Sequence, residues 1–123
     1  MLITFLFACA SSLQGFWNGT CTFDDTQNQA DLDVSADIRS DNGYLLSGGL
    51  TLTDWERNEF STTLDGDHSG KYVTIRGRFE IGEGTYLFHA ETVRVGGNSL
   101  DGDCTIKGND SPGGLMGETL LER

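Results

Sequence analysis

The sequence predicts an all-β domain: an eight-stranded antiparallel up-and-down meander barrel preceded by a short apolar leader. Segments of alternating apolar and polar residues recur along the chain, with turn-forming residues between them. The chain has 17 glycines and one proline, and this glycine share, roughly twice the usual one, suits many tight turns. No window of helical length shows a convincing 3.6-residue period. A length of 123 residues, with 37% hydrophobic residues, fits one domain with a small core.

Residues 1–12 are predicted to be a leader or anchor segment, and residues 13–123 the barrel domain. An apolar run from Met1 to Ala10, followed by small residues, is typical of an export signal. It is too short for a transmembrane helix, which needs about 20 apolar residues. Leu6-Phe7-Ala8-Cys9 resembles a bacterial lipobox, which implies that Cys9 carries a lipid anchor. The alternative is an apolar N-terminal strand or tail.

The first three strands are predicted at Gly15–Phe23, Asp31–Arg39 and Tyr44–Thr53. The second alternates most clearly, with aspartates on the face opposite its apolar residues. Asp41-Asn42-Gly43 predicts a tight turn before the third strand, because Asn-Gly readily adopts the positive φ angles of hairpins. The residues expected to point inward are Trp17, Cys21, Phe23, Leu32, Val34, Ala36, Ile38, Tyr44, Leu46, Gly48, Leu50 and Leu52.

The remaining strands are predicted at Glu59–Leu64, Lys71–Phe79, Thr85–Val95, Leu100–Lys107 and Leu115–Glu122. Turns or loops at 65–70, 82–84, 96–98 and 108–114 separate them. The strand at Thr85–Val95 carries apolar residues on both faces. The inward residues in this half of the chain include Val73, Ile75, Gly77, Phe79, Leu100, Gly102, Cys104 and Ile106.

Hairpin-connected strands of this number can close into a barrel, which removes both sheet edges. Inward glycines at Gly48, Gly77 and Gly102 favour closure, since strands that bend around a narrow barrel need positions without a side chain. A two-sheet sandwich is the main alternative. A membrane barrel is excluded by outward charges where a lipid-facing surface would be apolar, among them Asp31, Asp33, Asp37, Arg76 and Arg78.

The cysteines favour an oxidising compartment. If Cys9 is lipidated or removed, Cys21 and Cys104 remain as an even pair suited to a disulfide; the alternative is three free thiols in a reducing cytosol. In an ideal meander the two strands lie on either side of the last strand. Strands two places apart are about 9–10 Å from each other in a flat sheet, so a bond requires a flattened barrel or a different strand count.

The formal net charge of −11 excludes binding to nucleic acid or to an anionic membrane surface, because both need clustered basic residues and the chain has only Lys71 and Lys107 as lysines.

Three stretches, GFWNGT, YLLSGGLTL and GGLMGETLLER, resemble small exported bacterial β-barrels. The avidin and lipocalin folds begin in a similar way, with glycine and tryptophan on the first strand. This resemblance covers residues 15–123 at the level of architecture, and it implies that the ring of Trp17 plugs one end of the barrel. It transfers no biotin or lipocalin ligand site onto particular residues. Some periplasmic protease and lysozyme inhibitors are also eight-stranded barrels, and fold alone does not determine function.

Candidate catalytic and metal-binding residues are few. The 65–70 segment, DGDHSG, matches the first half of a calcium loop, but Arg76 stands where a bidentate glutamate is needed, so we expect a solvated turn and no metal. His89 and Glu91 lie two residues apart on one strand face, and we expect an outward polar pair. No nucleophile motif accompanies them, and the sequence therefore predicts neither an enzyme nor a cofactor.

The function predicted from these observations is binding of a small apolar ligand in the mouth of an exported, periplasmic or lipid-anchored barrel. The residues expected to bind the ligand are Trp17, Tyr44, Trp55 and Phe88. The alternative partner is a protein: an envelope interaction or inhibitor module would use Trp55 and the acidic loop at Asp65–Asp67 against a basic surface.

Overall fold

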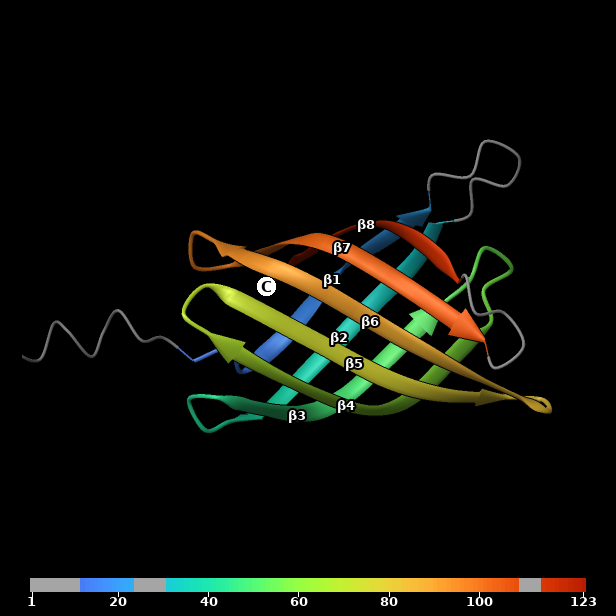
Figure 1. Ribbon diagram of the computed structural model, residues 1–123, viewed down its shortest axis with the longest axis horizontal. Helices are drawn as coiled ribbons and strands as arrows, with labels where there is room; N and C mark the ends of the chain where they lie inside the picture. Colours follow the sequence, from blue (N-terminus) through green and yellow to red (C-terminus); the bar gives the residue numbers. More distant parts are fainter. Residues whose placement is uncertain (1–11, 24–30, 109–113) are drawn as a thin grey trace, which may run out of the picture.

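Apolar–polar alternation produces eight strands in the computed structural model, which describes residues 12–23, 31–108 and 114–123. All of them run along the length of one elongated barrel (Figure 1). The strands are β1 (Gly15–Phe23), β2 (Asp31–Asp41), β3 (Leu45–Thr53), β4 (Glu59–Ser69), β5 (Tyr72–Ile81), β6 (Gly84–Val95), β7 (Ser99–Gly108) and β8 (Leu115–Glu122).

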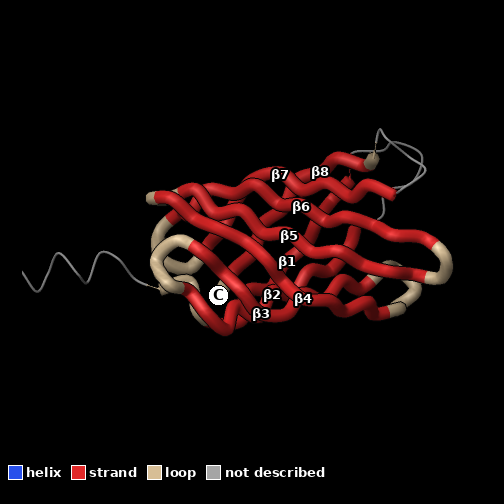
Figure 2. Tube along the Cα trace, turned by 60° about the horizontal axis from the view of Figure 1, so that its bottom comes forward, coloured by secondary structure: helices blue, strands red, loops and turns tan. Residues whose placement is uncertain are grey.

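Each strand pairs antiparallel with its neighbours in sequence, and β1 pairs with β8 to close the barrel. The closing register runs from Asn18 opposite Glu122 to Phe23 opposite Gly117. Figure 2 shows the resulting continuous wall of strands. The predicted eight-stranded meander barrel is therefore confirmed, and the sandwich alternative is wrong.

The two ends of the barrel differ in what they carry (Figure 1). One end, called the closed end below, has the entry of the chain into β1, the end of β8, and the β2–β3, β4–β5 and β6–β7 hairpins. The other end, called the open end, has the β3–β4 and β5–β6 connections, the end of β7 and the start of β8.

Alternation along the strands fills the interior with apolar side chains. The segment before β1 adds Leu13, which is buried against them. The buried core comprises Leu13, Trp17, Cys21, Phe23, Val34, Ala36, Ile38, Leu46, Leu50, Leu52, Leu64, Val73, Ile75, Phe79, Phe88, Ala90, Leu100, Cys104 and Leu121. At about 25 cal/mol per Å² of apolar surface, their burial is the main favourable contribution to folding.

Several predicted boundaries shift by one or two residues; β2 ends at Asp41 instead of Arg39, and β5 at Ile81 instead of Phe79. Two larger corrections affect candidate residues. Tyr44 lies in the β2–β3 turn and is exposed, because the Asn42 side chain accepts hydrogen bonds from the Tyr44 and Leu45 N–H groups and delays the start of β3. The predicted 65–70 loop is mostly strand: β4 continues to Ser69, since residues 64–69 pair with β5 and 64–67 with β3.

Two of the predicted inward glycines stand where the backbone of the neighbouring strand comes too close for a side chain. A Cβ at Gly48 would meet the Asp37 carbonyl, and one at Gly102 would meet the Glu91 carbonyl. These obstacles are backbone atoms of the neighbouring strand, so no side chain can move aside to make room. At Gly77 the constraint is instead side-chain packing, with Leu50 2.6 Å from the added atom.

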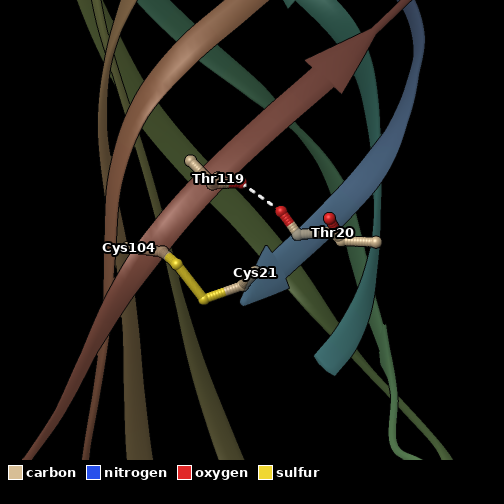
Figure 3. The surroundings of a disulfide bond; sticks show 4 residues. All are labelled: Thr20, Cys21, Cys104 and Thr119. Atoms are coloured by element: carbon tan, nitrogen blue, oxygen red, sulfur yellow. Dashed lines mark hydrogen bonds between the residues drawn. A yellow bond between two sulfur atoms is a disulfide. The ribbon is translucent and has the colours of Figure 1, made fainter. Parts of the chain in front are cut away.

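A disulfide joins Cys21 of β1 to Cys104 of β7 across the intervening β8, with the two Cα atoms 6.1 Å apart (Figure 3). The flat-sheet spacing overestimates this separation because the wall curves between β1 and β7. Both cysteine side chains are buried on the concave side of the wall, where they can meet. Gly117 of β8 lies opposite Cys104, and a Cβ there would meet the Thr22 carbonyl. Beside the bond, the Thr119 hydroxyl donates to the Thr20 carbonyl at 2.7 Å. Eight strands and the disulfide are thus compatible.

None of the described residues forms a helix long and apolar enough to cross a membrane.

Candidate ligand cavity

The open end of the barrel contains a cavity of about 360 Å³. This lies within the usual range of small-molecule sites, about 300–1,000 Å³. Side chains from β2 to β7 and from the β3–β4 loop line it: Leu32, Leu52, Asp54, Trp55, Phe60, Phe79, Ile81, Tyr86, Phe88 and Ile106.

Strand register explains why these residues meet. At the open end, the even-numbered strands begin and the odd-numbered strands finish. The lining residues of the strands are the inward-facing residues nearest to these starts and finishes. Phe88 of β6 stands opposite Gly77 of β5 and Ile106 of β7, for example. Gly77 has no side chain, and Leu50, Thr62 and Phe79 fill the space that a Cβ there would take.

The β3–β4 loop is organised around the Asp54 carboxylate. Oδ1 of Asp54 accepts the Glu56 N–H at 2.9 Å and the Asn58 N–H at 2.8 Å, and Oδ2 accepts the Asn58 side-chain N–H at 3.2 Å. Arg57 adopts a φ of 70°, and its guanidinium lies 3.5 Å from Asp33 of β2. The loop therefore has a defined shape, and it places Trp55 at the edge of the cavity with 68% of that residue exposed.

The hydrogen bonds of this loop also affect the charge of Asp54. Loss of water around the carboxylate raises its pKa, but the bonds from the Asn58 backbone, the Asn58 side chain and the Glu56 backbone outweigh that effect. The pKa of Asp54 therefore lies below its usual value, and the group carries a negative charge at neutral pH.

The structure separates the four residues that the sequence predicts to bind a ligand. Trp55 and Phe88 line the cavity. Trp17 does not, because it lies at the closed end, where it is fully buried. Tyr44 also lies at the closed end, exposed in the β2–β3 turn.

Trp17 closes the barrel, as the lipocalin-like resemblance implies. Its indole N–H donates to the Leu13 carbonyl at 2.8 Å, and the Arg123 guanidinium lies 4.7 Å from its ring centroid. That guanidinium also donates to the carbonyls of Ser12, Gln14 and Gly97 at 2.8, 3.0 and 3.1 Å. The segment before β1 and the last residue of the chain are in this way held over the tryptophan.

A second polar cluster at the closed end holds the same segment. The buried Asp41 carboxylate accepts the Leu13 N–H at 2.9 Å and lies 2.7 Å from Nε2 of His68. Burial alone raises the pKa of Asp41, but the bonds from Leu13, His68 and Gly43 outweigh it and leave that pKa below its usual value. His68 thus lies in β4 and pairs with Asp41, and it is not part of the predicted solvated turn.

The remaining candidate polar residues lie on the outer wall. Asp65 and Asp67 face Arg76, at 3.6 and 3.1 Å, and they lie well along β4 from the open end. They are therefore separated from Trp55, with which the alternative function combines them. His89 and Glu91 form the expected outward pair, 3.4 Å apart. Within the described ranges, no group of three or more histidine, cysteine or acidic side chains is placed to hold a metal ion.

The sequence singles out Trp55 and Phe88 among the lining residues but not the other eight: Leu32, Leu52, Asp54, Phe60, Phe79, Ile81, Tyr86 and Ile106. The signal was present in the strand order. In a meander, the ends of odd-numbered strands and the starts of even-numbered strands meet at the same end of the barrel. Inward residues at those positions therefore belong together, once the strand boundaries are known.

Solved structures similar to this chain share its fold. One is the protein EF1p2_mFAP2b bound to DFHBI, with 12% identity, a TM-score of 0.73, and coverage of 90% of this chain and 93% of that one. Another is a de novo designed fluorescence-activating β-barrel, with 9% identity, a TM-score of 0.68, and coverage of 94% of this chain and 96% of that one. No protein-family model and no curated protein sequence matches the chain.

At these identities the likeness shows the fold alone. The chain is an eight-stranded antiparallel meander barrel with a cavity at one end.

Proposed function

We propose that this barrel binds a small apolar molecule in the open-end cavity and does not catalyse a reaction on it. The observation that carries the proposal is an accessible, largely apolar space of about 360 Å³ in an interior whose closed end is filled by side chains. Such a space with few polar groups is typical of small-molecule sites. The fold it shares with EF1p2_mFAP2b, which was solved bound to DFHBI, further supports it.

Binding is tested by titrating the purified barrel with N-phenyl-1-naphthylamine, a neutral apolar dye that fluoresces more strongly in apolar surroundings. We expect saturable binding that Ile106→Trp weakens by about tenfold or more, ~1.4 kcal/mol, because the larger ring occupies the cavity. Val95→Trp is the matched control, since Val95 is exposed on the outer wall. Equal dye binding by all three proteins, with unchanged folding by circular dichroism, would place the dye elsewhere and refute the cavity as the site.

The Cys21–Cys104 disulfide indicates an oxidising compartment. We propose further that the barrel is exported to a periplasm or envelope and anchored there through Cys9, which lies outside the described residues. Intact mass spectrometry of protein made with its full sequence in a bacterial host tests this. A diacylglycerol-sized increment that Cys9→Ala removes is the expected result, and an unmodified chain retained in the cytosol contradicts it.

A further inference from the structure

We infer that the cavity selects an apolar molecule carrying a positively charged amine, with the Asp54 carboxylate as the residue that recognises the charge. This inference rests on the proposed function and specifies its ligand class. It follows from the charges around the open end.

Asp54 is the only charged residue among the described residues that line the cavity. The other lining residues are apolar or aromatic, so Asp54 is the charged side chain of the lining that can meet a charge on a bound molecule. An anionic head group would face it without a basic partner in the lining, whereas a cationic one would gain a favourable interaction.

The carboxylate has capacity for another partner. Oδ1 already accepts two backbone N–H groups, while Oδ2 accepts only the Asn58 side chain at 3.2 Å. A carboxylate oxygen can accept about two hydrogen bonds, so Oδ2 retains one acceptor position. An ammonium group has donors only and matches this position.

The surrounding open end adds charge of the same sign. Four further carboxylates belong to the β3–β4 and β5–β6 connections or their immediate flanks: Glu56, Glu59, Glu80 and Glu83. Of the basic residues at this end, Arg57 lies 3.5 Å from Asp33. Arg78 and Lys107, which both stand opposite Leu87, are exposed on the outer face and are not part of the lining. An apolar cavity with an acidic entrance attracts cations and repels anions.

A matched set of competitors tests the inference: 4-phenylbutylamine, 4-phenylbutanol and 4-phenylbutyrate share one apolar body and carry charges of +1, 0 and −1 at pH 7. Each is used to displace N-phenyl-1-naphthylamine from the full chain. We expect the amine to bind tightest and the carboxylate weakest, with the amine about fivefold tighter than the alcohol, as for a partly exposed ion pair. High salt should reduce this preference.

Asp54→Asn removes the charge while leaving a side-chain oxygen for the Glu56 and Asn58 N–H groups. We expect it to bring the affinity for the amine within about twofold of that for the alcohol, each affinity being referred to the variant's own affinity for the dye. Glu56→Gln, in the same loop but outside the lining, is the control and should keep the order.

Equal affinities for the three competitors, or a preference for the carboxylate, would overturn the inference while dye binding still supports the proposed function. An amine preference that survives Asp54→Asn, or that Glu56→Gln reduces equally, would refute the role of Asp54. If Asp54→Asn loses dye binding, the test is made on the wild type alone. A preference for the amine over the alcohol that high salt reduces then supports the inference, and a preference that salt does not change overturns it. If neither the dye nor any competitor binds the wild-type barrel, the proposed function itself fails.

Discussion

Arg123 concentrates more interactions than any other single side chain that we describe at the closed end. Its planar guanidinium stacks on Trp17 and donates to three backbone carbonyls, while its Nε donates to the Asn98 side chain at 3.2 Å. A lysine keeps the charge but has neither the plane nor the fork of donors.

We therefore expect Arg123→Lys to lower the free energy of unfolding by about 1–3 kcal/mol, measured by urea denaturation. Arg57→Lys is the control: the side chain of Arg57 is 81% exposed and its ion pair with Asp33 is long, so we expect a change below about 0.5 kcal/mol. Equal losses for the two variants would show that the contacts over Trp17 add nothing specific.

Asp41 links the stability of the closed end to pH. Its pKa is lower in the folded protein than the reference value of 3.8, so folding favours the ionised form. The stabilisation is complete above the unfolded pKa and is lost as pH falls through the folded pKa. We expect the free energy of unfolding to decrease between pH 5 and strongly acidic pH, and Asp41→Asn to make that decrease shallower.

The measurement is urea denaturation of both proteins at several pH values in this window. The pKa of Asp54 is shifted in the same direction. Asp41→Asn should therefore keep part of the acid-induced loss of unfolding free energy, and the double variant with Asp54→Asn should keep less of it. Parallel pH profiles for wild type and Asp41→Asn would contradict this account.

At the scale of the strand, the close approach of neighbouring backbones requires glycine at particular positions. Gly102→Ala would place a methyl group against the Glu91 carbonyl, and we expect it to cost more than about 2 kcal/mol, because backbone atoms cannot repack. Gly97 has nothing within 4 Å of an added Cβ, so Gly97→Ala should change stability by less than about 0.5 kcal/mol. Thermal unfolding followed by circular dichroism compares the two.

The strands themselves were largely predictable. β1 and β8 have the predicted bounds because Gly15, Gly114 and the segments of alternation mark their limits. β4 was underestimated because Asp65, Gly66 and Asp67 have the composition of a turn, and only pairing with β3 and β5 makes them strand. Tyr44 continues the alternation in sequence, yet side-chain bonds from Asn42 keep it in the turn.

The candidate site was predictable only in part. Of the four residues predicted to bind a ligand, Trp55 and Phe88 line the cavity, whereas Trp17 and Tyr44 lie at the closed end. Composition gave no information on which end stays open. That depends on Leu13, a residue outside the strands, which packs into the closed end together with Trp17. The charge selectivity of Asp54 likewise depends on loop geometry that the residue pattern alone does not specify.

At the scale of the whole molecule, the disulfide contributes stability through the long loop that it closes, because Cys21 and Cys104 are 83 positions apart in the sequence. We expect the Cys21→Ala/Cys104→Ala double variant to lose about 2–5 kcal/mol of unfolding free energy, measured by urea denaturation. A reducing agent should destabilise the wild type by a similar amount and leave the double variant unchanged. An effect of the reductant on the double variant would indicate a different target.

The same bond has a topological consequence. With the chain between them, Cys21 and Cys104 form a covalent ring that contains β2 to β6 entirely, while β8 lies outside it in the gap between β1 and β7. Among the described strands, β8 is the only complete one that can leave or enter the wall without breaking this ring. The position of β8 in the wall is fixed by the buried side chains of Thr119 and Leu121, and by the Arg123 guanidinium, which follows β8 and lies over Trp17. The connection before β8 is therefore the natural place to divide the barrel into two complementing fragments, one with β1 to β7 and the disulfide, the other with β8.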